Sequence, residues 1–255
     1  MKTVIGNWKM RVGTRESVAL ARSLLLALRG QKGLPEIVLC PPYVAFSEVH
    51  KIVARSHLAL GAQDIFWEET GSFTGEISSR MMTELGVQYA IIGHSERRDL
   101  FGETNEMVHR KVEAAIKGGI IPIVCVGENR KQRAAGEQFD IVAAQLHGGL
   151  SRLKLRSGQK IFIAYEPLWA IGTGQAANAR DAVAMHKFIR EHGRDILTAP
   201  AKNIRVLYGG SIEPENAYEF LHESEIDGVL VGGASVEVKS FKAIIRIASE
   251  VLSEN

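Results

Sequence analysis

Short apolar runs alternate with longer amphipathic runs along the whole chain. The short runs are almost continuously apolar, which is typical of parallel strands buried on both faces, because a strand with one solvated face would alternate with polar residues. Eight such runs predict strands, at residues 3–5, 37–40, 58–62, 89–92, 121–126, 161–165, 204–208 and 228–231.

The longer runs repeat apolar residues at spacings of three and four, which places them on one stripe of a helix facing a sheet. Two clear examples are Val18, Ala21, Leu25, Leu28 and Val108, Val112, Ala115, Ile116. This strand-then-helix order continues through 255 residues without a linker, so we expect one α/β domain spanning residues 1–255. Its size fits a closed (β/α)8 barrel. On periodicity alone, an open doubly wound sheet of the same elements is the alternative.

Composition narrows the class of protein. The chain is 45% hydrophobic and 24% charged, as in ordinary globular enzymes. Its formal net charge of +2 gives no broad attraction to nucleic acid or to an anionic membrane. Neither a secretory signal pattern nor a membrane-length apolar run is present, so a cytoplasmic location is expected. Cys40 and Cys125 belong to no metal-binding pattern and are expected to be reduced core thiols.

In a barrel, function lies in the loops that follow the strands. The side chains just past the first six predicted strands include Asn7, Lys9, Gln63, His94, Glu96, Glu128 and Glu166. The last two strands are followed by Gly209-Gly210-Ser211 and Gly232-Gly233. Backbone N–H groups that no side chain shields can bind an anion, and this position in a barrel is the usual phosphate site. The glycines therefore indicate a phosphorylated substrate, although each alone would also fit a tight turn.

Glu166 follows the apolar run 161–165 and precedes a proline, a costly place for a charge without a function. A carboxylate that is partly withdrawn from water at the mouth of a barrel is a candidate base. The segment that follows it is stiff at its start, apolar in its middle and glycine-rich at its end, which is typical of a lid that excludes water, with a packed structural loop as the alternative. Its residues are Pro167, Leu168, Trp169, Ala170, Ile171, Gly172, Thr173 and Gly174.

Other catalytic motifs are missing or misplaced. Residues 172–177 match the dinucleotide-binding pattern GxGxxA, but they lie late in the chain and several residues beyond a strand. We interpret that match as coincidence. The P-loop, HExxH, GxSxG and EF-hand patterns are absent, which argues against phosphoryl transfer on a P-loop, zinc proteolysis and acyl-serine chemistry.

Five motifs together resemble one known family. They are the segments at residues 6–10 (GNWKM), 93–98 (GHSERR), 164–174 (AYEPLWAIGTG), 208–211 (YGGS) and 230–234 (LVGGA). Their residues, order and spacing closely resemble those of the triosephosphate isomerases, and the likeness extends from end to end. The resemblance implies a TIM barrel that interconverts dihydroxyacetone phosphate and glyceraldehyde 3-phosphate through an enediolate, with no cofactor and no metal. It also implies a place in glycolysis and gluconeogenesis.

The resemblance assigns the site residues. Glu166 is expected to be the base and His94 to polarise the carbonyl, while Lys9 and Asn7 stabilise charge on oxygen and Glu96 orients Lys9. Ser95 is expected to cap a short helix beside His94. Besides Asn7 and Lys9, phosphate is expected to contact the backbone of Gly172, Ser211, Gly232 and Gly233. Tyr208 and Ser211 are expected to latch the closed lid onto Gly174 and Ala177.

The segment from Gln63 to Glu76 is long for a compact barrel and keeps Ile65, Phe66, Trp67 and Phe73, so it needs a surface that buries them. By resemblance it docks into a second copy of the chain, with Thr74, Gly75 and Glu76 at its tip and Thr74 bracing the partner's Asn7 and Lys9 region. Arg11 stands where the family usually has Asn. This departure is expected to affect dimer contacts and to leave the chemistry untouched.

Two other functions fit part of the pattern. An isomerase of the same mechanism could act on another small ketose phosphate, such as a four-carbon sugar, because sequence does not measure a pocket. A barrel that binds phosphate ligands without catalysis would keep the glycine loops, but it would usually have lost Lys9, His94 or Glu166.

Overall fold

The computed structural model describes residues 1–155, 158–170, 177–197 and 203–254. Eight described strands form a closed parallel barrel in which each strand pairs with its sequence neighbours and β1 pairs with β8. The strands are β1 (Thr3–Asn7), β2 (Glu36–Cys40), β3 (Leu58–Ala62), β4 (Tyr89–Ile92), β5 (Ile121–Val126), β6 (Ile161–Tyr165), β7 (Ile204–Tyr208) and β8 (Gly228–Val231). This closure confirms the (β/α)8 TIM barrel and excludes the open doubly wound sheet.

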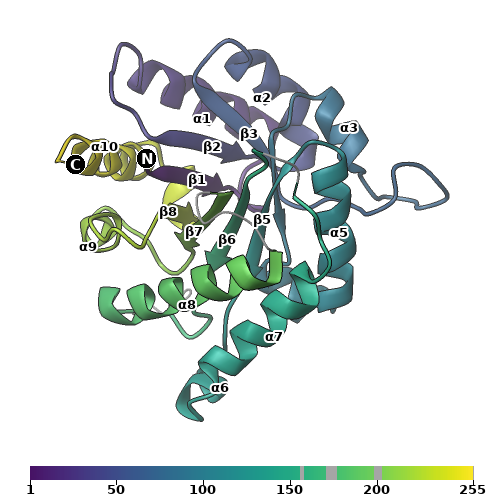
Figure 1. Ribbon diagram of the computed structural model, residues 1–255. Coiled ribbons are helices and arrows are strands. Elements are labelled where there is room, and N and C mark those ends of the chain that lie inside the picture. Colours follow the sequence, from purple (N-terminus) through teal and green to yellow (C-terminus); the bar gives the residue numbers. More distant parts are fainter. Residues whose placement is uncertain (156–157, 171–176, 198–202, 255) are drawn as a thin grey trace.

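Helices surround the strands (Figure 1). They are α1 (Thr14–Ala27), α2 (Phe46–Val53), α3 (Ser79–Glu84), α4 (Ser95–Phe101), α5 (Asn105–Lys117), α6 (Arg130–Ala134), α7 (Gln138–Leu150), α8 (Ala179–Leu197), α9 (Ala217–Leu221) and α10 (Val238–Glu254), with 3-10 turns η1 (Tyr43–Ala45) and η3 (Gly233–Val236). The described part of the chain contains no helix that could cross a membrane.

Both faces of the strands are buried, as their continuous apolar runs predict. Alternate residues such as Ile5 and Phe162 fill the inside of the barrel, while their neighbours Val4 and Ile163 pack outward against the helices. Cys40 and Cys125 belong to the inner cluster and are buried free thiols.

Glycine permits the closure between the first and last strands. Gly228 pairs with Thr3, and a β-carbon at Gly228 would lie only 1.9 Å from the Thr3 carbonyl oxygen. Any side chain there would push β8 away from β1. The barrel, and with it the relative position of the loops at its mouth, therefore depends on this residue.

The helical stripes are partly as predicted. Val108, Val112, Ala115 and Ile116 are all buried on α5. On α1, Ala21 is buried as expected, and Leu28 is buried just past the end of the helix, but Val18 and Leu25 are only partly buried. Ser17 and Leu24 are buried in place of these two neighbours, so the buried face is turned slightly from the predicted stripe.

Candidate active site

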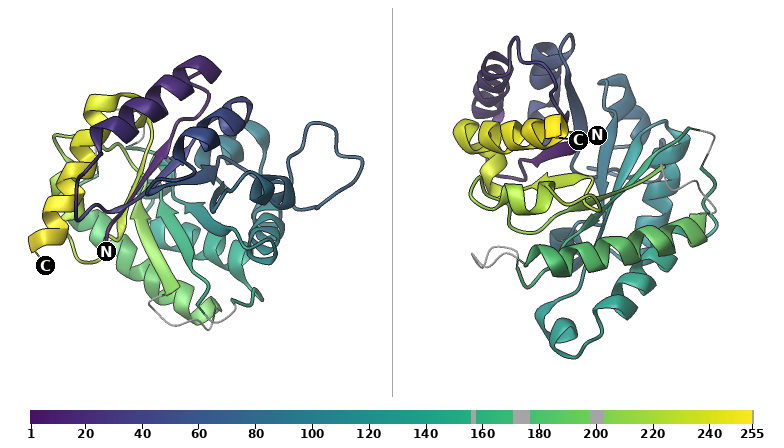
Figure 2. Two further views of the ribbon diagram at one scale, coloured as in Figure 1. Left: turned by 90° about the horizontal axis from the view of Figure 1, so that it is seen from above. Right: turned by 60° about the vertical axis from the view of Figure 1, so that its left-hand side comes forward.

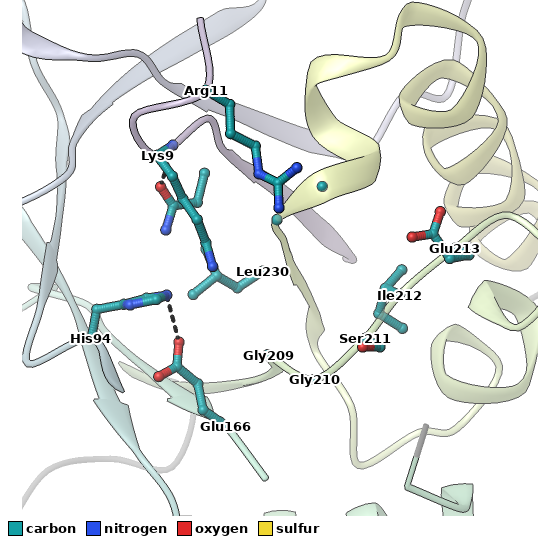
Figure 3. A pocket seen from close by; sticks show the side chains of 13 residues that line it. Lys9, Arg11, His94, Glu166, Gly209, Gly210, Ser211, Ile212, Glu213 and Leu230 are labelled. Carbon is teal, nitrogen blue, oxygen red and sulfur yellow. Dashed lines mark hydrogen bonds and ion pairs between the residues drawn. The ribbon is translucent and has the colours of Figure 1, made fainter. Parts of the chain in front are cut away.

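A cavity of about 200 Å³ opens at the carboxyl ends of the strands. Figure 3 shows that Lys9, His94 and Glu166 point toward one another on one side of it. The lining residues come from both ends of the chain: Asn7, Lys9, Arg11, His94, Glu166, Gly209, Gly210, Ser211, Ile212, Glu213, Leu230, Gly232 and Gly233. The fold thus brings together the side chains that follow β1, β4 and β6 and the glycine loops that follow β7 and β8.

The turn after β1 presents Lys9. The backbone of Lys9 has a φ of +51°, in the left-handed region that non-glycine residues seldom adopt. Local hydrogen bonds hold this conformation, since the Asn7 side-chain oxygen accepts from the Lys9 N–H at 3.1 Å and Gln63 Nε2 donates to the Lys9 carbonyl at 2.9 Å. Asn7 is itself buried. The position of the Lys9 ammonium is therefore set by a strained turn and two amide side chains.

Glu96 pairs with this ammonium. Its Oε1 accepts a hydrogen bond from Lys9 Nζ at 2.7 Å, and its side chain is half exposed. Burial raises the pKa of Glu96, but the hydrogen bond and charge of Lys9, with smaller contributions from His94 and Arg11, bring that pKa below its usual value. The carboxylate therefore stays ionised and holds Lys9 at the edge of the cavity.

His94 is the N-cap of α4. Its Nδ1 accepts a hydrogen bond from the Glu96 backbone N–H at 3.2 Å. Because an accepting nitrogen carries no proton, this contact assigns the proton of the ring to Nε2 in a neutral imidazole. The expectation that Ser95 caps this helix is wrong, since Ser95 is already the first helical residue. The Ser95 backbone N–H donates to Glu166 instead.

Glu166 lies directly after β6 and is almost fully buried. Its Oε1 is 3.1 Å from His94 Nε2, and its Oε2 accepts from the Ser95 N–H at 2.9 Å. Gly127 makes this placement possible, because a β-carbon there would lie 1.8 Å from the Glu166 carbonyl oxygen. The Glu166 N–H also donates to the Val126 carbonyl at 2.7 Å. A carboxylate, a neutral imidazole N–H and an ammonium thus face one small space.

The two glycine-rich loops form the opposite wall. Ser211, Gly232 and Gly233 all line the cavity. Within the residues that the structure describes, the backbone N–H groups of Ser211 and Gly233 donate to no acceptor. Free donors at a cavity wall are suited to an anion such as phosphate. Gly172, the remaining predicted phosphate contact, lies outside the described residues.

The start of the predicted lid is anchored beside the cavity. Pro167, Leu168, Trp169 and Ala170 are described, whereas Ile171, Gly172, Thr173 and Gly174 lie outside the described residues. Ser211 Oγ donates to the Ala170 carbonyl at 2.9 Å, and the Tyr208 hydroxyl accepts from the Ala177 N–H at 3.3 Å. Both predicted latch residues therefore contact the segments that flank the undescribed part.

Glu128 and Gln63 both follow predicted strands, but their sequence position alone assigns them no role. Glu128 is fully buried, and its Oε1 accepts from Tyr165 Oη at 3.0 Å and from Trp169 Nε1 at 2.8 Å. It thus ties the start of the lid to β6. Gln63 holds the Lys9 turn, as described above. Both residues act through contacts with the ends of other strands, and the only sequence signal for them was their position just after a strand. Arg11, expected only at a subunit contact, lines the cavity.

The predicted docking segment lies apart from this cavity. It projects from the body of the barrel between β3 and α3 (Figure 2). Phe66 packs against Trp67 and Phe73 with ring centroids 4.1 and 4.7 Å apart, while Thr74, Gly75 and Glu76 are exposed at its tip. Further large apolar side chains are exposed elsewhere, among them Met10, Val44, Leu100 and Phe101. Among the contacts of the described residues, none joins Thr74 to Lys9.

Among the residues that the structure describes, no group of three or more His, Cys, Asp or Glu side chains could hold a metal ion.

The chain is similar to known proteins over nearly its whole length. A family model described as triosephosphate isomerase matches residues 2–248. The triosephosphate isomerase of Thermoanaerobacter sp. (strain X514) is 45% identical over 247 residues, covering 95% of this chain and 97% of that protein. The enzyme of Rhodopirellula baltica is 44% identical over 246 residues, with 96% of each chain covered. The crystal structure of the Bartonella henselae enzyme superposes with a TM-score of 0.85 at 34% identity, covering 96% of this chain and 98% of that one.

Proposed function

The chain belongs to the triosephosphate isomerase family and interconverts dihydroxyacetone phosphate and D-glyceraldehyde 3-phosphate; we propose that Glu166, His94 and Lys9 carry out this reaction. The observation that supports these roles is the convergence of one carboxylate and two hydrogen-bond donors on a single cavity. The reaction moves a proton between neighbouring carbons and shifts a carbonyl, so it needs one base and a stabiliser for the oxygen that gains charge.

In the proposed mechanism, the Glu166 carboxylate removes a proton from the carbon next to the substrate carbonyl. The electron pair of that C–H bond forms the carbon–carbon double bond of an enediolate, and the carbonyl oxygen takes the negative charge. His94 Nε2–H and the Lys9 ammonium donate to the oxygens. Protonated Glu166 then returns the proton to the former carbonyl carbon. His94 gives its Nε2 proton to the former carbonyl oxygen and takes the proton of the other hydroxyl, whose oxygen becomes the new carbonyl, so that His94 is regenerated and no cofactor is consumed.

The neutral ring of His94 suits this role. A histidine with Nδ1 held as an acceptor by the Glu96 N–H offers Nε2–H as a donor without adding a positive charge that would pair permanently with Glu166. Glu96 keeps Lys9 directed at the cavity, and Asn7 holds the turn that carries it. Asn7 and Glu96 thus position the groups that touch the substrate.

The phosphate of the substrate would bind to backbone N–H groups of Ser211, Gly232, Gly233 and Gly172, with Lys9 and Asn7 beside it. The free N–H groups of Ser211 and Gly233 at the cavity wall support this placement. The segment from Pro167 to Gly174 would close over the bound substrate and be latched by Tyr208 and Ser211. Closure matters chemically, because an enediolate phosphate that is exposed to water can eliminate its phosphate group.

A coupled assay with D-glyceraldehyde 3-phosphate, repeated in deuterated water, tests this mechanism. Isomerisation with deuterium appearing on carbon in recovered triose is expected, because the proton on Glu166 can exchange before it returns. Faster turnover of a four-carbon ketose phosphate would instead assign another substrate, and binding of phosphate without turnover would indicate a barrel that is not catalytic. Turnover with no deuterium incorporation under any condition would argue against a carboxylate-borne proton.

We further propose that the protein is a cytoplasmic homodimer. Thr74 would brace the Asn7 and Lys9 region of a partner subunit, and the exposed apolar side chains of Met10, Val44, Phe73 and Phe101 support a covered face. Sedimentation at low micromolar concentration is expected to show a dimer. A dominant monomer with full activity would contradict the bracing role.

A further inference from the structure

Arg11 lies in the wall of the active-site cavity. It follows Lys9 by two residues, so the same turn after β1 carries both cations. Figure 3 shows the Arg11 side chain extending beside Lys9 toward the yellow turn that follows β8. That turn carries Gly232 and Gly233, which line the same cavity. The guanidinium therefore lies on the side of the cavity where the free backbone donors are.

The two cations of this turn differ in their partners. Lys9 Nζ is 2.7 Å from Glu96 Oε1. The Arg11 guanidinium forms neither an ion pair nor a hydrogen bond with any residue in the part of the chain that the structure describes. Arg98, which packs behind the cavity, is in contrast bound to the Gly93 carbonyl and to Asn105. Arg11 thus has all of its donors available for a ligand.

Arg11 determines the net charge of the cavity lining. Its lining contains two cations, Lys9 and Arg11, and two carboxylates, Glu166 and Glu213, beside the neutral imidazole of His94. Without Arg11 the lining would carry one net negative charge, which would repel a phosphate dianion. With Arg11 the two signs balance, and the positive charge lies near the glycine loops rather than near the catalytic carboxylate.

We propose that Arg11 is a substrate-binding residue whose guanidinium attracts the phosphate group to the wall formed by Gly232 and Gly233. Guanidinium is suited to this, because it stays ionised and its planar donors match phosphate oxygens. The phosphate does not change charge during the isomerisation, so this contact stabilises bound substrate and transition state equally. Arg11 therefore lowers KM and leaves kcat almost unchanged. This inference rests on the proposed isomerase function and adds a substrate contact to the expected effect of Arg11 on dimer contacts.

Three variants test the proposal. R11Q removes the charge with little change in length, R11K keeps the charge, and R15Q removes the same charge from Arg15, an exposed residue of α1 that does not line the cavity. We expect R11Q to raise KM, and the inhibition constant of inorganic phosphate, roughly fivefold at low ionic strength, with kcat within twofold of wild type. R11K, which keeps the charge but loses the planar donors, is expected to lie between wild type and R11Q, whereas R15Q is expected to match wild type.

Ionic strength provides a second measurement. Electrostatic attraction between Arg11 and the substrate is screened by salt, so the fall of kcat/KM with added salt should be shallower in R11Q than in wild type and R15Q. Equal KM values and equal salt slopes in R11Q and R15Q would overturn the proposal. So would a loss of activity in R11Q that follows subunit dissociation in sedimentation, since Arg11 would then act only at the interface. An inactive wild type would instead contradict the proposed function itself.

Discussion

Asp227 and Glu166 are both largely buried carboxylates beside cationic or imidazole side chains, but they lie at opposite ends of the barrel. Asp227, at the amino-terminal end, accepts hydrogen bonds from Arg190 Nη2 at 2.9 Å and from the Val206 N–H at 2.8 Å, and it lies 3.0 Å from Arg205 Nε. Asp227 does not line the active-site cavity. Its charge is used to join β7 to β8 and to α8.

Glu166, at the carboxyl-terminal end, lines a cavity of about 200 Å³. It accepts one backbone N–H, from Ser95, and its Oε1 lies 3.1 Å from His94 Nε2. A carboxylate whose hydrogen-bonding capacity is filled by the protein stabilises the fold, whereas one that borders a cavity can exchange a partner for a substrate. We therefore expect substitutions at the carboxyl-terminal end of the barrel, the mouth, to alter the catalytic rate. Substitutions at the amino-terminal end, near Asp227, should alter the free energy of unfolding.

The largest effect is expected for Lys9→Met. Removing the ammonium that faces the developing oxygen charge should cost roughly 3 kcal/mol or more of transition-state stabilisation, or at least about 100-fold in kcat/KM. The urea midpoint should change little, because the partner Glu96 is half exposed. Lys51→Met, at an exposed lysine paired with Glu48, is the matched control and should leave both quantities unchanged. Activity within twofold of wild type in Lys9→Met would contradict the assignment.

Asp227→Asn should produce the converse result. The substitution leaves Arg205 without its carboxylate partner and Arg190 with only Glu225, 3.6 Å away, which we expect to lower the free energy of unfolding by about 3 kcal/mol. Below the unfolding transition, kcat should stay within twofold of wild type. Glu250→Gln, which breaks the exposed pair with Arg246, is the control and should cost less than about 0.5 kcal/mol. A large loss of kcat in folded Asp227→Asn would break the comparison.

Glu166→Asp tests the role of the active-site carboxylate with a milder substitution than Lys9→Met, because it keeps the charge and shortens the side chain. Shortening the side chain withdraws the carboxylate by about 1 Å, which should lower kcat on the order of 100-fold with little change in KM. Steady-state kinetics at saturating and limiting triose phosphate separates the two parameters. Unchanged turnover would remove Glu166 from the role of base, whereas a raised KM with constant kcat would make it a binding residue only.

The smallest expected effect concerns pH and His186, a fully buried residue of α8 whose Nδ1 contacts the Glu225 carbonyl at 3.3 Å. Burial lowers the pKa of His186 from 6.5 to about 3, so the ring is neutral in the folded protein. The unfolded chain binds a proton below pH 6.5 and the folded chain does not. The contribution of His186 to stability is therefore complete above that pH and is lost progressively as pH falls toward 3.

Between pH 6.5 and 5.5 this single group should lower the free energy of unfolding by about 1 kcal/mol. Urea unfolding across this range measures the slope. His186→Gln should flatten it, while His222→Gln, at a histidine with 60% of its side chain exposed, should not. Equal slopes in wild type and His186→Gln would show that the buried ring is not the source of the pH dependence.

Much of the fold follows from local pattern. The predicted strands at residues 89–92, 121–126, 161–165, 204–208 and 228–231 coincide with β4 to β8. Continuous apolar runs identify them because both faces are buried. On α1, Ala21 and Leu28 are buried as predicted, whereas Ser17 and Leu24 are buried in place of Val18 and Leu25, because the rotation of a helix against its neighbours is set by tertiary packing.

Part of the candidate site could likewise be predicted from the sequence, and part could not. Lys9, His94 and Glu166 could be chosen from sequence, since each polar residue directly follows an apolar run or belongs to a motif. The hydrogen bonds of Glu128 to Tyr165 and Trp169 could not, because they join three loop and strand positions whose separation depends on barrel closure. The same holds for Arg11, whose side chain could reach either a subunit contact or the cavity.

The sequence by itself determined which segments become strands and helices, in what order, and which reactive side chains stand at the strand ends, because these properties depend on neighbours within a few residues. Only the tertiary structure decided which of those side chains meet. The approach of Glu166 to His94 needs a glycine at 127 that admits a backbone contact, and closure of β8 on β1 needs one at 228. Such contacts depend on the packing of distant segments, which periodicity and composition do not contain.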